Sequence, residues 1–187
     1  MIKFIKRWYR KSRKKMKVEW NRVLPFSEYV VDRWEKAQFL GFGEKTSIYD
    51  SSIVMGDVRV GNNTWIGPYT MLDGSGGRLE IGNHCDISTG VQIYTHDTVK
   101  ECVSGGAYPK ETASVSIGDN CYIAPSCIIS KGVVLGKSCI VCAQSFVNKS
   151  FGDYSIVAGI PAKKIGEVVI SELGDVTMKY YEVADNK

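Results

Sequence analysis

Long apolar runs are missing from this chain. No run of about 18 apolar residues occurs in the 187-residue sequence, which argues against an apolar spanning helix. Residues 1–17 do not look like a cleaved signal peptide either, because charges run through the segment and no apolar core follows. We therefore expect a cytoplasmic protein with one ordinary domain and an appendage, long enough to bury a core.

Histidine is scarce, and the six cysteines are poorly spaced for a metal. Only two histidines could assist thiolates in binding zinc, so we expect no metal site. Free cysteine behaves as a small hydrophobic residue and is typical of a reduced compartment. Small buried thiols are therefore the preferred interpretation.

Acidic residues are absent from residues 1–17, which hold nine of the 24 lysines and arginines. Ile2, Ile5, Trp8 and Tyr9 are spaced as one side of a helix within this basic arm. Such a composition is typical of a segment that makes peripheral contact with the inner face of an anionic membrane. Docking of the apolar residues on the protein's own subunit or on a neighbour is the alternative. We do not expect nucleic acid as a partner, since no recognised binding fold accompanies the charge.

Aliphatic residues recur every six positions from residue 48 onward, a period that fits neither a helix nor simple strand alternation. With one slip of three residues and one gap, the rule holds at Ile48, Val54, Val60, Ile66, Leu72, Ile81, Ile87, Ile93, Ile117, Ile123, Ile129, Leu135, Val141 and Val147. A small residue usually stands four positions later, and Cys85, Cys121, Cys127 and Cys139 occupy this place. The pattern predicts an all-β solenoid of short parallel strands, in which neighbouring hexads bury one another's aliphatic side chains.

These hexads resemble those of the hexapeptide-repeat acyltransferases, which include galactoside, maltose and capsule or O-antigen sugar O-acetyltransferases. The resemblance rests on the block IGDNCYIAPSCIISKGVVLGKSCIVCAQSFVNK and on the closing VAGIPAKKIG, and it spans residues 48–166. It implies a left-handed parallel β-helix of triangular cross-section. It also implies a homotrimer with active sites between subunits.

The expected organisation has three parts. Residues 1–47 are predicted to be a basic helical arm with a lead-in, and residues 48–165 the β-helix. An excursion loop interrupts the β-helix near residues 97–114, and residues 166–187 form a C-terminal tail.

His96 stands at the root of that excursion. Between Ile93 and Ile117 the six-residue repeat is interrupted by a polar segment. Insertions of this length are uncommon unless they are functional. As the fourth residue of its hexad, His96 is predicted to project outward, and the resemblance places the family's catalytic histidine here. An imidazole exchanges protons near neutral pH and so suits a general base. A solvated histidine without a role is the alternative.

The resemblance implies that acetyl-CoA is the donor and that a hydroxyl of a sugar or saccharide precursor is the acceptor. It implies contacts with the CoA arm at Ala143, Asn148, Lys149 and Lys163, with Lys164 as a further candidate. Many relatives carry Thr-Lys at the place of Asn148 and Lys149, so Asn148 departs from the pattern. Three extra residues interrupt the repeat within MLDGSGGRLEIG, and Asp73 in this segment is a candidate for binding the acceptor. A turn that has lengthened without any functional role is the alternative.

Other functions remain in view. Acylation of the amine of a nucleotide-linked amino sugar would suit the same fold, and a non-catalytic scaffold recruited to a membrane would need no base. A cysteine nucleophile is disfavoured, because four cysteines take the inward site and the other two have no evident base nearby. A hexapeptide-repeat carbonic anhydrase is disfavoured too, because its zinc needs three histidines.

Overall fold

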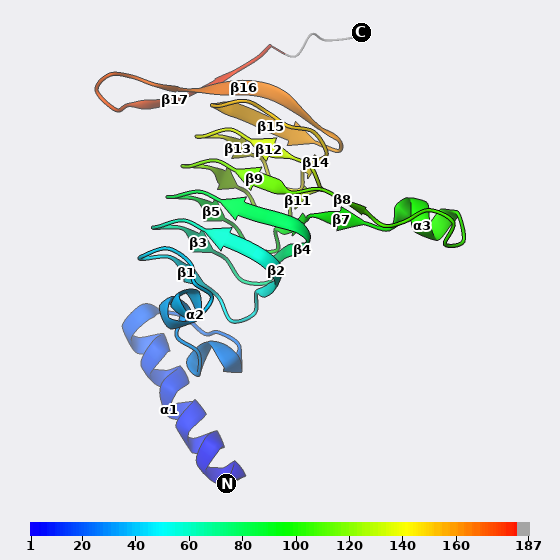
Figure 1. Ribbon diagram of the computed structural model, residues 1–187. Coiled ribbons are helices and arrows are strands. Elements are labelled where there is room, and N and C mark those ends of the chain that lie inside the picture. Colours follow the sequence, from blue (N-terminus) through cyan, green and yellow to red (C-terminus); the bar gives the residue numbers. More distant parts are fainter. Residues whose placement is uncertain (183–187) are drawn as a thin grey trace.

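A computed structural model describes residues 1–182, arranged as a stack of strands with helices at one end and a long hairpin at the other (Figure 1). The last part of the predicted C-terminal tail, residues 183–187, lies outside the described residues. No helix within residues 1–182 is both long enough and apolar enough to cross a membrane.

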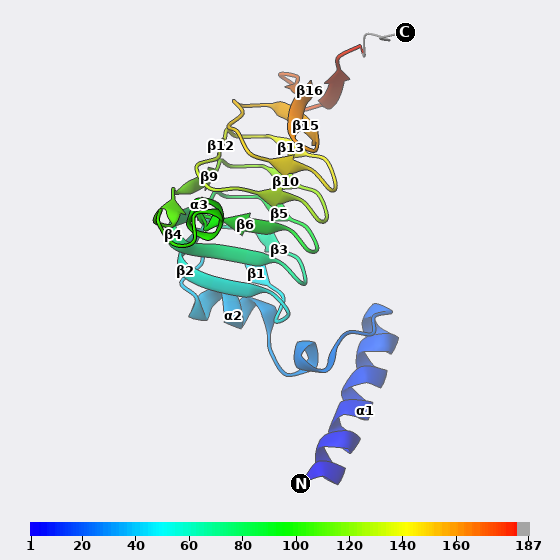
Figure 2. The ribbon, with the colours of Figure 1, turned by 90° about the vertical axis from the view of Figure 1, so that its right-hand side faces the viewer.

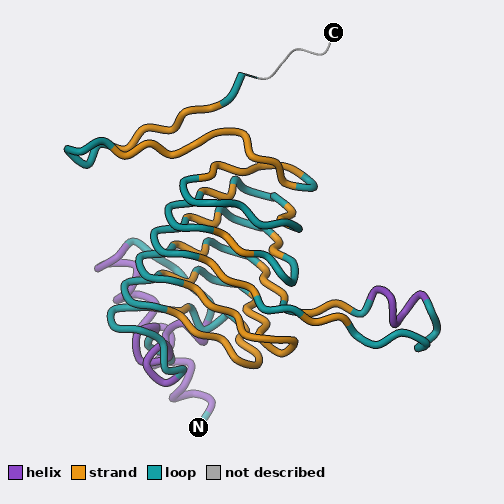
Figure 3. The backbone as a smooth tube through the Cα atoms, turned by 45° about the horizontal axis from the view of Figure 1, so that its top comes forward, coloured by secondary structure: helices purple, strands orange, loops and turns teal. Residues whose placement is uncertain are grey.

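The strands form three faces, and the chain visits each face once per turn (Figure 3). The first face contains parallel strands in the order β1 (Ser47–Ile48), β3 (Trp65–Ile66), β5 (Asp86–Ile87), β10 (Tyr122–Ile123), β13 (Ile140–Val141) and β15 (Ser155–Gly159). Consecutive members of this face are separated in sequence by the other two faces. The architecture is therefore a solenoid of stacked coils, as the repeat predicts.

Two long strands bend from the second face into the third. β2 (Ile53–Val60) and β4 (Met71–Ile81) pair in parallel along both faces. The second face continues with β6 (Gln92–Tyr94), β11 (Ile128–Ile129) and β14 (Phe146–Val147). The third face continues with β9 (Val115–Ile117) and β12 (Val134–Leu135), and Phe151 bridges to Leu135.

The predicted hexad aliphatics fill the interior. All fourteen are buried except Val54, which is half-buried in the first coil. The pairing stacks like on like, for example Leu72 on Ile93 and Ile123 on Val141. Each buried branched side chain contributes roughly 1.5–3 kcal/mol relative to an exposed one, so the column supplies much of the stability.

The small residues four positions after each aliphatic also point inward, which confirms the interpretation of the cysteines. Cys85, Cys121, Cys127 and Cys139 are buried free thiols. Each donates from Sγ to a backbone carbonyl of the next coil, as Cys121 does to Gly136 at 3.1 Å. A thiol therefore packs as a small residue and satisfies one carbonyl.

The first coil is covered by a helical module. It consists of α1 (Ile2–Trp20), the 3-10 turn η1 (Phe26–Tyr29) and α2 (Arg33–Phe39), whose Asp32 side chain caps the N-terminus of α2. Lys36 of α2 donates to the carbonyls of Tyr49, Asp50 and Ser52 at 2.9–3.1 Å. These bonds join the module to the first coil, and α1 then extends away from the solenoid (Figure 2).

The C-terminal end does not follow the predicted boundary between residues 165 and 166. That boundary falls inside β16 (Ala162–Ile170), which pairs antiparallel with β15 and then with β17 (Val176–Tyr180). The predicted tail therefore contains a hairpin that extends beyond the last coil (Figure 1). Pairing to β15 explains the difference, because the last coil still presents unpaired backbone groups that a further strand can satisfy.

The predicted excursion projects from the side of the solenoid, but it is more ordered than a plain loop. β7 (His96–Asp97) pairs antiparallel with β8 (Glu111–Thr112), and between them lies the short helix α3 (Val99–Val103). From here on, residues 96–112 are called the arm, and the basic segment at the N-terminus is named by its helix, α1. Its ribbon fixes the backbone at the root and carries the helix outward (Figure 1).

Candidate active site

His96 begins the arm and stands on the edge where the second face turns into the third. Ile93, three residues earlier, is fully buried, and Thr95 is also buried, so the backbone under the imidazole is anchored. The His96 side chain is 25% exposed, which agrees with its predicted outward direction. A ring in this position is reachable from solvent while its attachment is rigid.

Asp73 lies directly beneath this imidazole. Its carboxylate is 2% exposed, and Oδ2 is 3.4 Å from His96 Nδ1. A buried carboxylate in that place favours the tautomer that carries its proton on Nδ1, and we assign that tautomer from the contact. Nε2 is then left with a free lone pair, as a general base requires.

The Asp73 carboxylate, predicted to bind the acceptor, faces the imidazole rather than solvent. A carboxylate buried at 2% exposure and directed at the imidazole is poorly placed to bind the hydroxyl of an acceptor. Its other oxygen accepts the backbone N–H of Ser75 at 2.9 Å. The side chain is thus held toward His96 rather than toward solvent.

The three-residue insert within β4 packs against His96. Ser75 Oγ lies 3.3 Å from Nδ1, and Thr95 accepts the Gly76 N–H at its Oγ1 at 2.9 Å. A Cβ on Gly76 would lie 2.5 Å from His96 Cβ. The glycines of the insert therefore allow one coil to approach the histidine of the next.

Ion pairs fasten the root of the arm to the following coil. Lys131 Nζ is 2.7 Å from Asp97 and 3.3 Å from Glu111, and Lys100 reaches Glu111 at 2.7 Å. The Lys131 ammonium lowers the pKa of the Asp97 carboxyl, and Lys100 foremost lowers the pKa of Glu111. Since exposed ion pairs add little stability, their main effect is to fix the direction of the arm.

Two predicted CoA contacts share the edge of His96. Because β6, β11 and β14 stack in register, Asn148 and Lys149 follow β14 at the same corner, two coils beyond His96. Strand spacing makes this a separation of about 10 Å along the edge. Both side chains are exposed, and Lys149 Nζ lies 5.5 Å from the centroid of the Phe151 ring.

The other predicted contacts lie at the neighbouring corner, between the first and second faces. Ala143 follows β13, whose partner β15 continues to Ala158, and Ala158 pairs with Lys163. Ala143 and Lys163 are exposed there. Lys164 is engaged with Glu167 at 2.6 Å, which leaves Lys163 as the less occupied cation. One chain therefore does not bring all the predicted contacts to one place.

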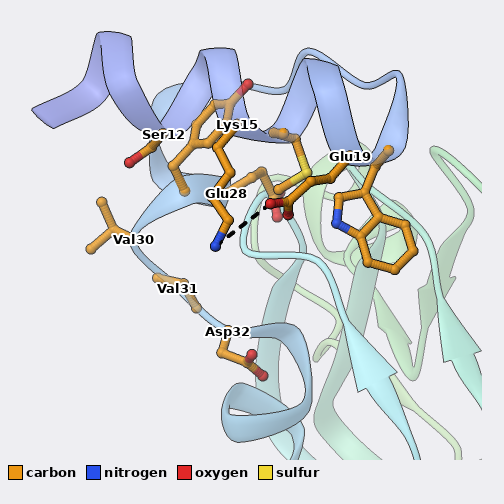
Figure 4. A pocket seen from close by; sticks show the side chains of 10 residues that line it. Ser12, Lys15, Glu19, Glu28, Val30, Val31 and Asp32 are labelled. Atoms are coloured by element: carbon orange, nitrogen blue, oxygen red, sulfur yellow. Dashed lines mark ion pairs between the residues drawn. The ribbon is translucent and has the colours of Figure 1, made fainter.

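A hollow of about 350 Å³ lies elsewhere, between α1 and residues 28–32 (Figure 4). Its lining includes the ion-paired Lys15 and Glu19 and the buried Glu28. The Glu28 carboxylate is already satisfied, because it accepts from the backbone N–H groups of Asp50 and Ser51 and from the Ser51 hydroxyl. Glu28 therefore joins the module to the first coil and is not a candidate base.

Five of the six thiols are buried or half-buried. Cys139 and Cys142 are three residues apart, but Cys139 is buried in the core while Cys142 is half-buried at a corner, and both are free. Burial raises the pKa of Cys127 and Cys142, which disfavours the reactive thiolate. Within residues 1–182, no three His, Cys, Asp or Glu side chains are grouped to hold a metal ion.

The repeat itself matches a known family. Residues 114–149 fit the family described as bacterial transferase hexapeptide (six repeats), which confirms the resemblance seen in the sequence. The chain is 27% identical over 126 residues to the carnitine operon protein CaiE of a Proteus strain. It spans 64% of the length of that protein, and the match covers 65% of this chain.

Acetyltransferases are among the similar proteins. WcaF of Escherichia coli K12, whose name assigns it to acetyl transfer in colanic acid biosynthesis, is 27% identical over 80% of this chain and 84% of its own. The hexapeptide-repeat acetyltransferase VCA0836 of Vibrio cholerae, solved with acetyl-CoA, has 20% identity and a TM-score of 0.54 over 86% of this chain and 87% of its own.

A second similar protein of known structure is an N-acyltransferase. The N-acyltransferase AntD of Bacillus cereus, solved with dTDP and 3-hydroxybutyryl-CoA, has 22% identity and a TM-score of 0.57. The alignment covers 72% of this chain and 89% of AntD. At such identities the two solved structures establish the shared fold.

Sequence reasoning singled out His96 but missed the residues that contact it. Ser75 and Gly76 lie in the three-residue insert, whose glycines did not indicate which residue they approach. Lys131 gave no signal, since a lysine at a solenoid corner is usually just solvated. Only the stacking of coils brings these residues to the histidine.

We expect Gly76→Ala to displace His96 while leaving the solenoid folded, because the added methyl would overlap the histidine's own Cβ. Overlaps of this kind typically cost about 1–3 kcal/mol. The measurements are the midpoint of thermal unfolding and the NMR signals of the imidazole rings. The chain has two histidines. His84, on another corner, serves as the internal reference.

Gly152→Ala is the matched control, since a methyl group added at Gly152 would meet no atom within 4 Å. It should leave both the unfolding midpoint and the His96 signals unchanged. An unchanged His96 signal in Gly76→Ala would contradict the close packing of the insert.

Proposed function

We propose that this chain is a CoA-dependent O-acetyltransferase that moves an acetyl group from acetyl-CoA to a hydroxyl of a sugar or saccharide precursor. The observation that carries the proposal is the Asp73–His96 pair, with 3.4 Å between Oδ2 and Nδ1, at the root of the arm. The likeness to WcaF, VCA0836 and the hexapeptide family supports the reaction class and the donor. Without the histidine geometry, the likeness would support little more than the fold.

In the proposed reaction, His96 acts as the general base. Nε2 takes the proton of the acceptor hydroxyl while that oxygen attacks the thioester carbonyl carbon. The C–S bond then breaks, and the imidazolium returns the proton to the departing thiolate, which leaves as the free thiol of CoA. A thioester is already activated, so this direct transfer needs no covalent enzyme intermediate.

Asp73 serves as a positioning residue in this scheme. Its carboxylate holds the ring by Nδ1 and stabilises the positive charge that the imidazole carries during transfer. A buried carboxylate interacts strongly with that charge because little water screens it. The Ser75 hydroxyl, 3.3 Å from Nδ1, adds a second polar contact on the same side.

The donor site we propose uses the exposed residues of the last coils. Lys149 and Lys163 would meet phosphates of CoA as point charges, and Ala143 would let the pantetheine arm approach the backbone. Asn148 lies beside Lys149 on the edge of His96 and would donate from its amide. These residues occupy two corners of one chain, so a neighbouring subunit would be needed to form one groove.

A homotrimer of left-handed β-helices would supply that neighbour. Exposed apolar side chains on the second and third faces support such an interface, among them Ile53, Ile128 and Val134. Sedimentation equilibrium of the full chain should give the mass of three chains. A monomer at all accessible concentrations would contradict both the trimer and a shared site.

N-acylation of a nucleotide-linked amino sugar is the second candidate, favoured by the likeness to AntD with its bound dTDP. A protonated amine must lose a proton before it attacks, so the same base would serve. Incubation with acetyl-CoA and matched panels of sugars and amino sugars, followed by mass spectrometry of the products, separates the two.

We expect His96→Gln to lower turnover by about 10²- to 10⁴-fold, the usual contribution of a general base. Glutamine retains a polar group of similar size, so folding should be preserved. The measurement is release of free CoA with the best acceptor found in the panel. His84→Gln is the matched control and should retain full activity, because His84 lies at another corner and is exposed.

Full activity in His96→Gln would exclude His96 as the base. No CoA release from the unmodified chain with any acceptor would favour the non-catalytic scaffold instead.

We expect Asp73→Asn to lower kcat by at least about tenfold while leaving the KM for acetyl-CoA nearly unchanged. The reason is that the amide removes the negative charge that stabilises the imidazolium formed during transfer. The matched control is Asp86→Asn on β5, since Asp86 is half-buried and, like Asp73, accepts a hydrogen bond from a serine two residues later, here the Ser88 hydroxyl at 2.8 Å. An equal loss of kcat in both variants, or no loss in Asp73→Asn, would contradict the positioning role.

A further inference from the structure

We propose that the N-terminal end of α1 is a docking surface for an anionic membrane. The surface consists of residues 1–7, all of which are exposed. It is independent of the proposed acyl transfer, because it rests on the charge and exposure of this helix alone.

Many of the cations share one side of the helix, and a row of apolar side chains lies on another. Lys3, Arg7, Arg10, Lys14 and Lys17 follow one another at intervals of four and three, so they share one stripe of the helix. The apolar stripe follows the same spacing elsewhere on the helix, through Ile2, Ile5, Tyr9, Met16 and Trp20. The helix carries a single acid, Glu19, in its last turn.

The middle of the apolar stripe is already occupied by the chain itself. The Tyr9 ring packs edge-on against Phe26 and Tyr29, at centroid distances of 5.2 and 5.4 Å. Trp8 meets Phe26 at 6.1 Å. Docking on the protein's own subunit, one of the two interpretations open from the sequence, therefore applies to this part of the helix.

The N-terminal end of the same stripe has no such cover, since Ile2 is 69% exposed and Ile5 42%. Phe4, which is 74% exposed, lies outside this stripe and next to Arg7 on the helix surface. They lie beyond η1, on the part of α1 that extends farthest from the solenoid (Figures 1 and 2). Lys3, Lys6 and Arg7 are interspersed with them.

An anionic bilayer fits this combination better than the other partners do. Apolar side chains that enter the acyl boundary, flanked by cations that meet lipid phosphates, are how interfacial helices bind. Nucleic acid would use the cations but would gain little from Ile2, Phe4 and Ile5. Two copies of this surface facing each other would bring the same positive charge to the contact and would repel each other.

Because the middle of α1 packs against the chain itself, its free end has a fixed orientation when it meets a membrane. Because Tyr9 and Trp8 hold α1 against η1, and Lys36 and Glu28 hold the module to the first coil, the free end has a fixed bearing relative to the solenoid. Membrane contact at residues 1–7 would then present the same side of the solenoid to the lipid every time.

The test is sedimentation of the full chain with vesicles. We expect binding to phosphatidylcholine vesicles that contain phosphatidylglycerol, weaker binding when salt is raised, and little binding to pure phosphatidylcholine. Each cation near an anionic surface contributes on the order of fivefold in partition. The triple variant Lys3→Glu, Lys6→Glu, Arg7→Glu should therefore lose on the order of 100-fold or more.

Two variants separate charge from insertion. The double variant Ile2→Ser, Phe4→Ser should bind anionic vesicles at least about tenfold more weakly, since the apolar contribution to interfacial binding is lost. Its matched control is Val103→Ser, Leu173→Ser, which removes exposed apolar residues from the arm and the C-terminal hairpin. The charge control is Lys110→Glu, Lys137→Glu, Lys179→Glu, which makes the same change in net charge on exposed residues elsewhere.

The proposal is overturned if either control weakens binding as much as its partner variant, or if pure phosphatidylcholine binds equally well. It is also overturned if a DNA duplex displaces the chain from vesicles while Ile2→Ser, Phe4→Ser binds DNA as tightly as the unmodified chain. Loss of self-association in that variant, without loss of vesicle binding, would assign the surface to a second copy. Vesicle binding measured in His96→Gln keeps this result separate from that of acyl transfer.

Discussion

Every other feature of this chain depends on the stacked column of buried aliphatic side chains. No hexad can bury its aliphatic alone, so each coil is stable only against the coils above and below it, as Leu72 is against Ile93. The backbone bonds between coils obey the same register. A change in the interior is therefore felt by neighbouring coils, whereas the edges of the solenoid can vary.

The candidate site uses that freedom. Both interruptions of the repeat, the insert after Asp73 and the arm after Thr95, occur at edges and leave the interior column continuous. Because coils stack in register, an insert in one coil lies against the departure point of the arm in the next. Asp73 and His96 meet for that reason, although they lie far apart in the sequence.

The two ends of the solenoid need a cover, since the first and last coils lack a neighbouring coil on one side. The helical module covers the first coil, with Ala37 buried and Lys36 bonding three carbonyls. At the other end, β16 pairs with β15 and carries the hairpin outward. The basic helix α1 belongs to the helical module but extends beyond it. For that reason part of its apolar stripe packs on the module and part is exposed.

The sequence by itself determined the solenoid, its inward residues and the place of His96, because a six-residue period leaves the same signature in every coil. It also marked the arm, as the segment where the period is lost. The tertiary structure alone decided that Asp73 faces the imidazole rather than solvent, that Gly76 packs against His96, and that Lys131 holds the arm. Those contacts join different coils, and a one-dimensional period states which residues are inside but not which edges come into contact once an insert shifts the register.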